Sequence, residues 1–515
     1  NATLGNSIIS LDKESTLFIK EGGNVGTQTL FNFLDLQSWI ILENIEPNKF
    51  LSDMTSQIWV NHGPAHMNSN YRINQFYQKG TLIRPFSESY PALTIYSGSN
   101  QTGNHADIYE KQIYSGAGIP NGMNDRTVSF VLKRGYMATF SVANNGTSKS
   151  KVYVASTDDL VIDELPEALQ NNVSFIRVLP WNWVVKKGTG GFTPEVNAGW
   201  FYQWNNTNTS KPNYEYVPMA WGAGATNPAG LQRVIEKDQV NHLLGFNESD
   251  NCNDQSGQFN NLCKPEVAVG YYENLMKTGM RLGTPAPREN GPTTWLLEFA
   301  ELAKARDVRF DFVAVHWYDW GSNPANTPNA DPQAIFNRFK NYLENVYRIY
   351  GLPIWITEFN ANPNRTNSIQ AEFLKLALPY LESLDYVERY AYFEPMARYA
   401  SNPVESADLT DENGNLTNIG EIYFSHPSTP SIPEATWESD GNLQGLNEPF
   451  TPINPEILSF EAECALYLGN KWEVKEDVNA SNGKFIQGNN SLEGESPLAN
   501  QFHYELDLEQ AKTYK

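Results

Sequence analysis

The spacing of hydrophobic residues changes twice along this 515-residue chain, and each change marks a region of different architecture. From about residue 155 to residue 425, short apolar runs alternate with longer amphipathic segments, a pattern typical of strands and helices that follow one another. The predicted helices include residues 265–278, 294–306, 332–350 and 369–384. The predicted strands are residues 174–179, 199–204, 216–221, 242–247, 281–284, 312–317, 353–357 and 389–393. Eight such repeats predict an α/β fold at residues 155–425, a (β/α)8 TIM barrel rather than an open sheet.

The region before the barrel, residues 1–154, carries short β-like runs between clusters of turn residues. These runs include residues 15–20, 56–60 and 127–133. No helical period of useful length accompanies them, so we expect an all-β, sandwich-like N-terminal domain. Residues 137–141 and 151–155 predict a late hairpin that turns through Asn144-Asn145-Gly146.

After the barrel, the pattern changes again. Residues 426–458 are rich in Pro and Ser and predict a linker. Short strand-like runs return at residues 459–515, a length below that of an ordinary sandwich domain. We therefore expect the chain to stop inside a further, partial β module.

Composition narrows the classes of function. Charged residues make up 19% of the chain, and the net charge of −22 argues against nucleic acid and anionic membranes as partners. No apolar run is long enough for a membrane span. The chain begins at Asn1 without a leader, which we interpret as a removed signal peptide or a mature terminus. We expect a secreted or extracellular protein, or a periplasmic or cell-surface one in a bacterium.

Three cysteines are present, and two of them, Cys252 and Cys263, lie close together in one predicted loop. A disulfide between them would fit an oxidising compartment; two reduced thiols are the alternative. No His lies near enough to favour a zinc site, so no metal ligands are predicted in the barrel.

Two predicted strands each end in a glutamate. Glu248 follows the fourth predicted strand and Glu358 follows the seventh. A carboxylate at the end of an apolar strand costs desolvation energy, so packing alone explains it poorly. Catalytic side chains of such barrels cluster at the carboxyl ends of the strands, and glycosidic bonds are cleaved by pairs of carboxylates. The two glutamates are therefore the candidate catalytic pair.

Five strand motifs carry a resemblance to a known group. They are Gly245-Phe-Asn-Glu-Ser-Asp250, Phe312-Val-Ala-Val-His-Trp-Tyr318, Pro353-Ile-Trp-Ile-Thr-Glu-Phe359, Trp200-Phe-Tyr-Gln-Trp204 and Tyr216-Val-Pro-Met-Ala-Trp-Gly222. The motifs resemble clan A retaining glycoside hydrolases and, more narrowly, are similar to the family 128 type of endo-β-1,3-glucanase. The resemblance covers about residues 172–425. One departure is Ser249, where the family usually has Pro; this bears on the loop conformation and not on the glutamate.

The resemblance implies that Glu248 is the acid/base and Glu358 the nucleophile. A general acid keeps its proton near neutral pH, and a second carboxylate nearby raises one pKa of such a pair. Asn247 would hydrogen-bond the sugar 2-hydroxyl; a helix cap is the alternative. His316 and Tyr318 lie two positions apart and face the same way. The resemblance implies that one or both orient the nucleophile, with a buried structural His as the alternative.

Several other side chains are candidates around this pair. Arg177 could pair with Glu358 and keep it ionised, or form a structural ion pair. Glu394, after the last predicted strand, is the strongest rival acid. Tryptophans near strand ends suit a glycan cleft because sugar rings stack on indole, although each alone is more often part of a core. The tryptophans concerned are Trp181, Trp204, Trp221, Trp317 and Trp320.

The C-terminal residues 460–485 resemble the first half of a family 6 carbohydrate-binding module. Such modules often hold a structural calcium ion through early acidic residues, which implicates Glu461 and Glu463. For the whole chain we expect a monomeric, retaining endo-β-glycanase, without a metal or cofactor in its chemistry, acting first on laminarin-like β-1,3-glucan. The alternatives are the same machinery on agar, porphyran or β-xylan, and a non-catalytic carbohydrate-binding protein.

Overall fold

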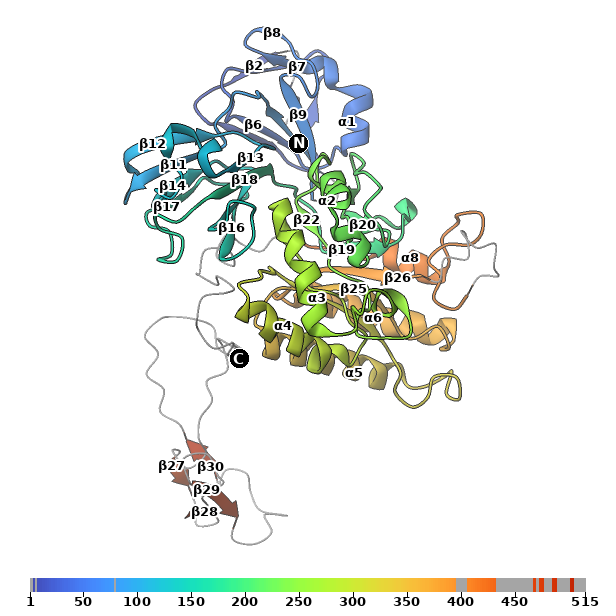
Figure 1. Ribbon diagram of the computed structural model, residues 1–515. Helices are drawn as coiled ribbons and strands as arrows, with labels where there is room; N and C mark the ends of the chain where they lie inside the picture. Colours follow the sequence, from blue (N-terminus) through green and yellow to red (C-terminus); the bar gives the residue numbers. More distant parts are fainter. Residues whose placement is uncertain are drawn as a thin grey trace. The chain divides into compact units, whose positions relative to one another are not determined.

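The computed structural model describes residues 3–4, 7–77, 80–394 and 405–431, together with four strands near the C-terminus. The chain divides into two units, Asn1–Pro452 and Ile453–Lys515 (Figure 1). The first unit holds N-terminal β-sheets and a parallel sheet with helices. The second unit holds two antiparallel strand pairs, β27 (Leu466–Leu468) with β30 (Gln501–His503) and β28 (Trp472–Glu476) with β29 (Lys484–Gly488).

The N-terminal region is β-structured, as the sequence predicts. Its first part has two four-stranded sheets, in the orders β2-β5-β7-β8 and β3-β6-β10-β9, and the short helix α1 (Pro47–Asp53). Phe31, Ile40, Phe50 and Ile83 belong to one buried core shared by the two sheets and α1. The strands are β2 (Ile8–Leu11), β3 (Thr16–Ile19), β5 (Leu30–Phe33), β6 (Trp39–Leu42), β7 (Ile58–Val60), β8 (Gly63–Pro64), β9 (Tyr71–Phe76) and β10 (Gly80–Pro85). The small pair β1 (Thr3–Leu4) and β4 (Asn24–Val25) is parallel.

A second pair of sheets follows, in the orders β12-β11-β14-β17 and β13-β18-β15-β16, around a core of its own. The predicted hairpin is confirmed, because β15 pairs antiparallel with β16 from Tyr136↔Ala155 to Ser141↔Ser150. The strands are β11 (Leu93–Gly98), β12 (Thr102–Ile108), β13 (Ile113–Ser115), β14 (Ser129–Leu132), β15 (Tyr136–Ser141), β16 (Ser150–Ala155), β17 (Leu160–Ile162) and β18 (Phe175–Pro180).

The predicted first strand of the barrel, residues 174–179, is wrong. It forms β18, which pairs antiparallel with β13 and β15 inside the N-terminal region. A fully buried antiparallel strand has the same continuous apolar pattern as a parallel one, so the sequence could not separate the two cases. The N-terminal sheets therefore extend to about residue 180, beyond the predicted boundary after residue 154.

The parallel sheet has the order β21-β20-β19-β26-β25-β24, and all its pairs are parallel. A separate parallel pair joins β22 to β23, and single parallel bridges join Met219 to Leu244 and Gly283 to Phe312. The strands are β19 (Lys187–Gly190), β20 (Trp200–Tyr202), β21 (Glu215–Tyr216), β22 (His242–Leu243), β23 (Arg281–Leu282), β24 (Val313–Tyr318), β25 (Ile354–Asn360) and β26 (Val387–Phe393).

β19, and not residues 174–179, is the first strand of the parallel sheet along the chain. Its sequence explains why the pattern of apolar residues did not predict it. Lys-Gly-Thr-Gly has no apolar run, yet all four residues are buried. The ammonium of Lys187 donates to the carbonyls of Tyr423 and His426, which offsets its desolvation. At Gly188, a Cβ atom would lie only 2.2 Å from the ring of Trp200, so the neighbouring indole requires a glycine there.

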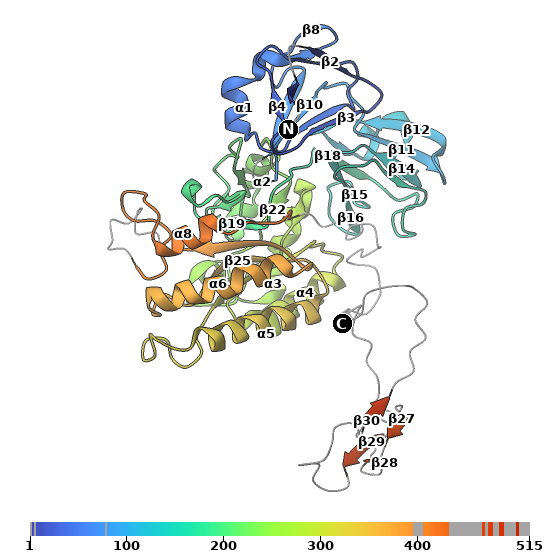
Figure 2. The same cartoon turned by 180° about the vertical axis from the view of Figure 1, so that it is seen from behind.

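Helices cover the parallel sheet, and α3 to α6 form its outer layer in two opposite views (Figures 1 and 2). The predicted helices are confirmed, with the segment from 265 continuing from α3 into a 3-10 helix. The helices are α2 (Pro228–Ile235), α3 (Pro265–Tyr272), α4 (Trp295–Ala305), α5 (Pro332–Tyr350), α6 (Asn367–Ser383) and α8 (Asn418–Ser425). Within the described part of the chain, no helix has both the length and the apolar character needed to cross a membrane.

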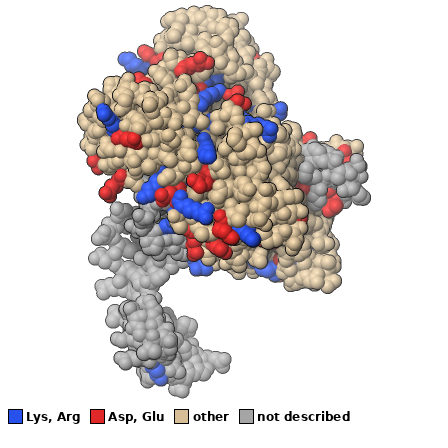
Figure 3. Space-filling model, viewed as in Figure 1, with Lys and Arg blue, Asp and Glu red and all other residues tan. Residues whose placement is uncertain are grey.

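The predicted linker begins too early. The amide of Lys186 donates to the carbonyl of Thr429, and the amide of Ser431 donates to the carbonyl of Val184, so residues up to 431 are bound to the segment just before β19. Residues 432–458, and Glu461 and Glu463 of the expected calcium site, lie outside the described residues. On the face drawn in Figure 3, acidic and basic side chains are interspersed over the described surface.

Candidate active site

Glu248 and Glu358 lie together at the carboxyl ends of the parallel strands. His316 stands between them: its Nδ1 atom is 3.2 Å from Oε1 of Glu248 and 3.5 Å from Oε2 of Glu358. One side-chain atom of each of the three residues lies within 4.8 Å of the others. The side chains of Glu248 and Glu358 are 14% and 8% exposed, so the pair is reachable but largely desolvated.

The pairing of the strands explains why Glu248, His316 and Glu358 lie close together. β24 and β25 are adjacent and parallel, and His316 and Glu358 are register partners across them. Glu248 comes after β22 in a loop that a parallel bridge between Asn247 and Ala286 holds in place. Its backbone φ of 43° lies in the left-handed region, which is uncommon for a residue with a side chain and is concentrated at functional sites.

Three donors surround the carboxylate of Glu358. Tyr318 donates its hydroxyl to Oε2 at 2.5 Å, and the indole of Trp204 donates to Oε1 at 2.9 Å. A longer bond of 3.3 Å comes from the hydroxyl of Tyr202. Burial, with the negative charge of Glu358, raises the pKa of Tyr318 well above its usual range, so the phenol remains a donor. Donors of this kind stabilise the ionised form of a carboxyl group.

Glu248 is paired with two cationic side chains. Besides His316, Arg288 donates Nε to Oε2 of Glu248 at 3.0 Å and Nη2 to Asp254 at 2.8 Å. Burial by itself raises the pKa of Glu248, but His316 and Arg288 outweigh that effect and lower it. This direction is opposite to the one expected for an acid whose proton is retained by a neighbouring carboxylate.

The pKa of His316 is shifted in the opposite direction to that of Glu248. Its burial lowers the pKa, but Glu358 and Glu248 outweigh burial and raise it to about 9. The imidazole is therefore a cation at neutral pH, and it lies against both carboxylates. The same three residues are the group that could ligate a metal within the described parts of the chain. A metal would need the neutral imidazole, so binding would have to displace the Nδ1 proton.

Asn247 and two of the tryptophans lie beside the pair. Asn247 is buried, its side-chain oxygen has no partner, and it caps none of the described helices, whose nearest N-caps are Asp254 and Lys264. Trp204 contacts Glu358 directly, as described above. Trp221 is partly exposed, and its ring centre lies 6.0 Å from that of Phe259.

Trp320 is 60% exposed and donates its indole N–H to Glu289 at 2.9 Å. Burial is the main cause that raises the pKa of Glu289. The charges of His316 and Glu248 also act on that pKa, so Glu289 is coupled electrostatically to the site. Trp320 thus presents a free ring face near the site, as the sequence suggests.

The other two tryptophans are corrections. Trp317 is buried against Phe339 and Phe373 on the helix side of β24, because neighbouring strand residues point to opposite faces and His316 faces the site. Trp181 is buried too, with its ring 5.3 Å from His242 at the amino end of β22, the end away from the carboxylates. Neither ring is available to a sugar in this arrangement.

Arg177 and Glu394 also differ from their predicted roles. Arg177 lies on β18 and donates to the carbonyls of Thr278 and Ile235, the last residues of two helical segments, rather than to Glu358. Glu394 accepts hydrogen bonds from Thr193 at 2.6 Å and from the amide of Leu409 at 3.0 Å. These contacts give both side chains structural partners.

Sequence reasoning missed Arg288 and Tyr202. Arg288 lies 40 positions from Glu248 along the chain, in the loop after β23, and no local spacing relates the two. Tyr202 is the last residue of β20 and could have been found as the polar end of an otherwise apolar strand.

The predicted disulfide between Cys252 and Cys263 is present. Within its loop, Ser256 donates to the carbonyl of Asn247 at 2.6 Å, which ties the loop to the site.

Residues 179–423 match the family model described as "Glycosyl hydrolase catalytic core". This region is a glycosyl hydrolase catalytic core. The match begins at the end of β18 and contains β19 to β26, so the N-terminal sheets lie before it apart from the last residues of β18. Its sequence is similar to alkali-sensitive linkage protein 1 of Schizosaccharomyces pombe, at 28% identity over 258 residues that cover 47% of this chain and 43% of the relative. The chain thus spans less than half the length of that relative.

The catalytic core is also similar to solved structures of glycoside hydrolase family 128. A subgroup I endo-β-1,3-glucanase of Amycolatopsis mediterranei, in complex with laminaritriose, is 30% identical; the match covers 47% of this chain and 99% of that one, with a TM-score of 0.39. A subgroup II endo-β-1,3-glucanase of Sorangium cellulosum is 24% identical over 47% of this chain and 98% of its own, with a TM-score of 0.38.

Proposed function

We propose that the catalytic core is a retaining endo-β-1,3-glucanase, with Glu358 as nucleophile and Glu248 as acid/base. The observation that carries this proposal is the close approach of the two carboxylates, whose nearest side-chain atoms lie within 4.8 Å around His316. Retaining enzymes place their carboxyl groups about 5–5.5 Å apart, whereas inverting enzymes need about 6.5–9.5 Å to admit a water molecule. The short spacing favours retention.

In this proposal Glu358 attacks the anomeric carbon, and the glycosidic bond to the leaving sugar breaks as a glycosyl–enzyme ester forms. The donors Tyr318, Trp204 and Tyr202 fix its orientation. Glu248 delivers its proton to the leaving oxygen, and then removes a proton from the water that hydrolyses the ester. The unpartnered side-chain oxygen of Asn247 accepts a hydrogen bond from a sugar hydroxyl.

The acid step requires that Arg288 release Glu248. While the guanidinium is bound to Oε2, Glu248 stays ionised and has no proton to give. A sugar that enters beside Glu248 would displace Arg288 towards Asp254, its second partner. The loss of Arg288 removes one of the two cations that lower the pKa of Glu248, so burial raises that pKa against His316 alone, towards the neutral form that a general acid needs.

The proposal includes a closed (β/α)8 barrel. Supporting observations are the bridges from Met219 to Leu244 and from Gly283 to Phe312, which connect the edges of the six-stranded sheet through β22 and β23. In a closed barrel of this kind all strand ends converge on one face, where loops bind the substrate. Trp204, Trp221 and Trp320 would then line the glycan cleft.

The choice of β-1,3-glucan rests on the similar endo-β-1,3-glucanases, of which one was solved with laminaritriose. Agar, porphyran and β-xylan stay as alternative substrates, because the carboxylate pair fixes the reaction and the surrounding loops fix the linkage. Secretion is part of the proposal, supported by the Cys252–Cys263 disulfide.

A second candidate function is saccharide binding without hydrolysis. The observation that favours it is the ion pair between Arg288 and Glu248, which opposes protonation of the acid. Under this alternative Arg288 never leaves, and the site holds a glycan through Asn247 and the tryptophans without cleaving it.

One assay separates the two candidates. Glu248→Gln and Glu358→Gln variants are incubated with laminarin and reducing ends are counted, with Glu394→Gln as the matched control of a buried acid. The hydrolase proposal expects wild-type cleavage and a loss of about a hundredfold or more in each of the two site variants. Cleavage that survives either site substitution, or a wild-type chain that binds laminarin without cutting it, would contradict the proposal.

A further inference from the structure

The loop of residues 252–263, which the disulfide closes, is bound to the candidate active site at two points. Ser256 donates its amide and its hydroxyl to the carbonyl of Asn247, at 3.3 and 2.6 Å. Asp254 accepts a hydrogen bond of 2.8 Å from Arg288, the guanidinium that also contacts the carboxylate pair. The loop is therefore one wall of the site and not an independent surface turn.

The loop is also held at its far end. Cys263 is cross-linked to Cys252, and its carbonyl accepts a 2.8 Å hydrogen bond from the indole of Trp295. Leu262 is buried in the hydrophobic core. A cross-link and a buried anchor restrict the loop before a ligand arrives, and a side chain that is already ordered loses less entropy on binding.

Phe259 lies on this loop and is 51% exposed. Its ring lies beside that of Trp221, with 6.0 Å between the ring centres and 52° between the ring planes. Trp221 is itself partly exposed, and its carbonyl accepts the amide of Asn247 at 3.0 Å. A single exposed apolar side chain is ordinary, but this one continues an aromatic surface that begins beside the residue before Glu248.

The immediate surroundings of Phe259 suit a sugar. The flat face of an aromatic ring fits the apolar CH face of a sugar ring. The neighbours along the chain, Gln258 and Asn260, are exposed and carry amides, which hydrogen-bond hydroxyl groups. All three side chains are uncharged, which suits a neutral glycan such as the proposed β-1,3-glucan.

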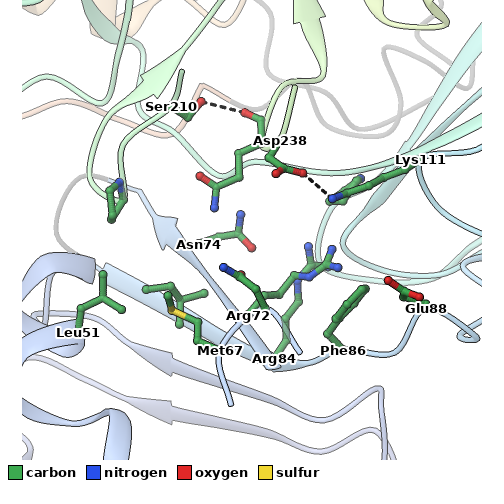
Figure 4. Close-up of a pocket in the computed structure, with 15 residues that line it drawn as sticks. Leu51, Met67, Arg72, Asn74, Arg84, Phe86, Glu88, Lys111, Ser210 and Asp238 are labelled. Atoms are coloured by element: carbon green, nitrogen blue, oxygen red, sulfur yellow. Dashed lines mark hydrogen bonds and ion pairs between the residues drawn. The ribbon is translucent and has the colours of Figure 1, made fainter. Parts of the chain in front are cut away.

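A second aromatic side chain shows why the position of Phe259 matters. Phe86 lines a separate cavity, bordered by β9, β10 and the loops before β21 and β22 (Figure 4). The guanidinium of Arg72 lies over the ring of Phe86 at 3.7 Å, a cation–π contact that covers one ring face. That cavity lies at the amino ends of the strands, whereas Glu248 and Glu358 lie at the carboxyl ends. Phe86 therefore cannot extend the active site as Phe259 does.

We propose that Phe259 binds a sugar ring of the substrate, next to the sugar that contacts Trp221, and that the disulfide holds Phe259 in the position for this contact. The inference rests on the proposed function, because the ligand is the same β-1,3-glucan chain. Phe259 does not touch the carboxylate pair, so its contact contributes equally before and during the reaction and acts on KM rather than on kcat.

Calorimetric titration with laminarihexaose tests the contact, with Glu358→Gln as the parent so that the probe is not cleaved. Adding Phe259→Ala should weaken binding by about tenfold, because a buried apolar contact is lost. Adding Phe259→Trp should keep the affinity within about threefold, since a flat ring face remains. Phe424→Ala is the matched control, because Phe424 is 42% exposed and lines a cavity beside the loops before β20 and β21. Equal affinity of the parent and its Phe259→Ala variant would overturn the inference.

Steady-state kinetics on laminarin separate a sugar contact from a structural role. With Glu358 intact, Phe259→Ala should raise KM by about tenfold and leave kcat within about twofold. A lower kcat at an unchanged KM would overturn the inference. The titrations need no cleavage, so a wild type that binds laminarihexaose without cutting laminarin would contradict the proposed function and leave this inference standing.

A double-mutant cycle tests the part of the disulfide. In the Glu358→Gln parent, replacing both Cys252 and Cys263 by Ser should weaken laminarihexaose binding by about threefold or more, because the loop must then be ordered on binding. Phe259→Ala should cost less in this open loop than in the closed one, since both changes act through the same contact. Losses that multiply in full would overturn the role of the disulfide in positioning Phe259.

Discussion

His316 and Glu358 are register partners on neighbouring parallel strands, and the same imidazole Nδ1 that lies 3.5 Å from Glu358 also lies 3.2 Å from Glu248. The two carboxylates are therefore held around one cation. Arg288 adds a second cation on the outer side of Glu248. The ionisation of the site is set by these two cations, and three of the predictions below follow from the contacts around the pair.

Arg288 is, after His316, the second cation that lowers the pKa of Glu248. Arg288→Met removes a charge that lowers the pKa of Glu248, so that pKa should rise. Since the general acid works in its protonated form, the alkaline limb of the pH–rate profile on laminarin should move to higher pH. Arg288→Lys keeps the charge and is the matched control, with a smaller movement. An alkaline limb that stays in place in Arg288→Met would contradict this role.

His316 should make stability depend on pH. Its pKa is raised from 6.5 to about 9 in the folded protein, so its contribution is complete below about pH 6.5 and is lost as the pH rises through about 9. The shift corresponds to a contribution on the order of 3 kcal/mol. The melting temperature of the wild type should therefore fall between these pH values.

The control for that measurement is His316→Gln, which cannot become a cation. Its melting temperature should be lower than that of the wild type at pH 6 and should change less towards pH 9. A wild type and a His316→Gln variant with parallel pH curves would show that the imidazolium contributes nothing to folding.

Tyr318 is expected to act on turnover rather than on binding. Tyr318→Phe removes the 2.5 Å hydrogen bond to Oε2 of Glu358 and leaves the ring in place. A hydrogen bond to a charged group is worth about 1.5–3 kcal/mol, so kcat should fall by about tenfold to a hundredfold, with a smaller change in KM. Tyr350→Phe, which removes a bond to the carbonyl of Pro292 away from the site, is the control. Equal effects of the two substitutions would indicate a structural role only.

The sequence predicted the carboxylate pair because each glutamate ends an apolar run, and that signal is local. It did not predict β19, whose Lys-Gly-Thr-Gly is buried through hydrogen bonds of Lys187 and a close indole rather than through apolar side chains. It placed residues 174–179 in the wrong sheet, because a buried run does not say which strands it pairs with. The alternation of side chains along a strand could have shown that Trp317 faces away from the site, because it directly follows His316, which faces the site.

The side chains that contact the two glutamates could not be predicted from the sequence, for a different reason. Arg288 meets Glu248, and Tyr202 meets Glu358, only after distant loops are brought together by the fold. Arg288 helps to lower the pKa of Glu248, whereas the sequence predicted a raised pKa for the acid of the pair. Side-chain ionisation is a property of the assembled site and not of the motif.

The stereochemistry of the first product tests the central claim most directly. Proton NMR of a laminari-oligosaccharide digest, recorded before mutarotation, shows which anomer is released first. A carboxylate pair this close predicts the β anomer, formed by two displacements through an ester on Glu358. Initial release of the α anomer would mean inversion by a single displacement, and would contradict the assignment of Glu358 as the nucleophile.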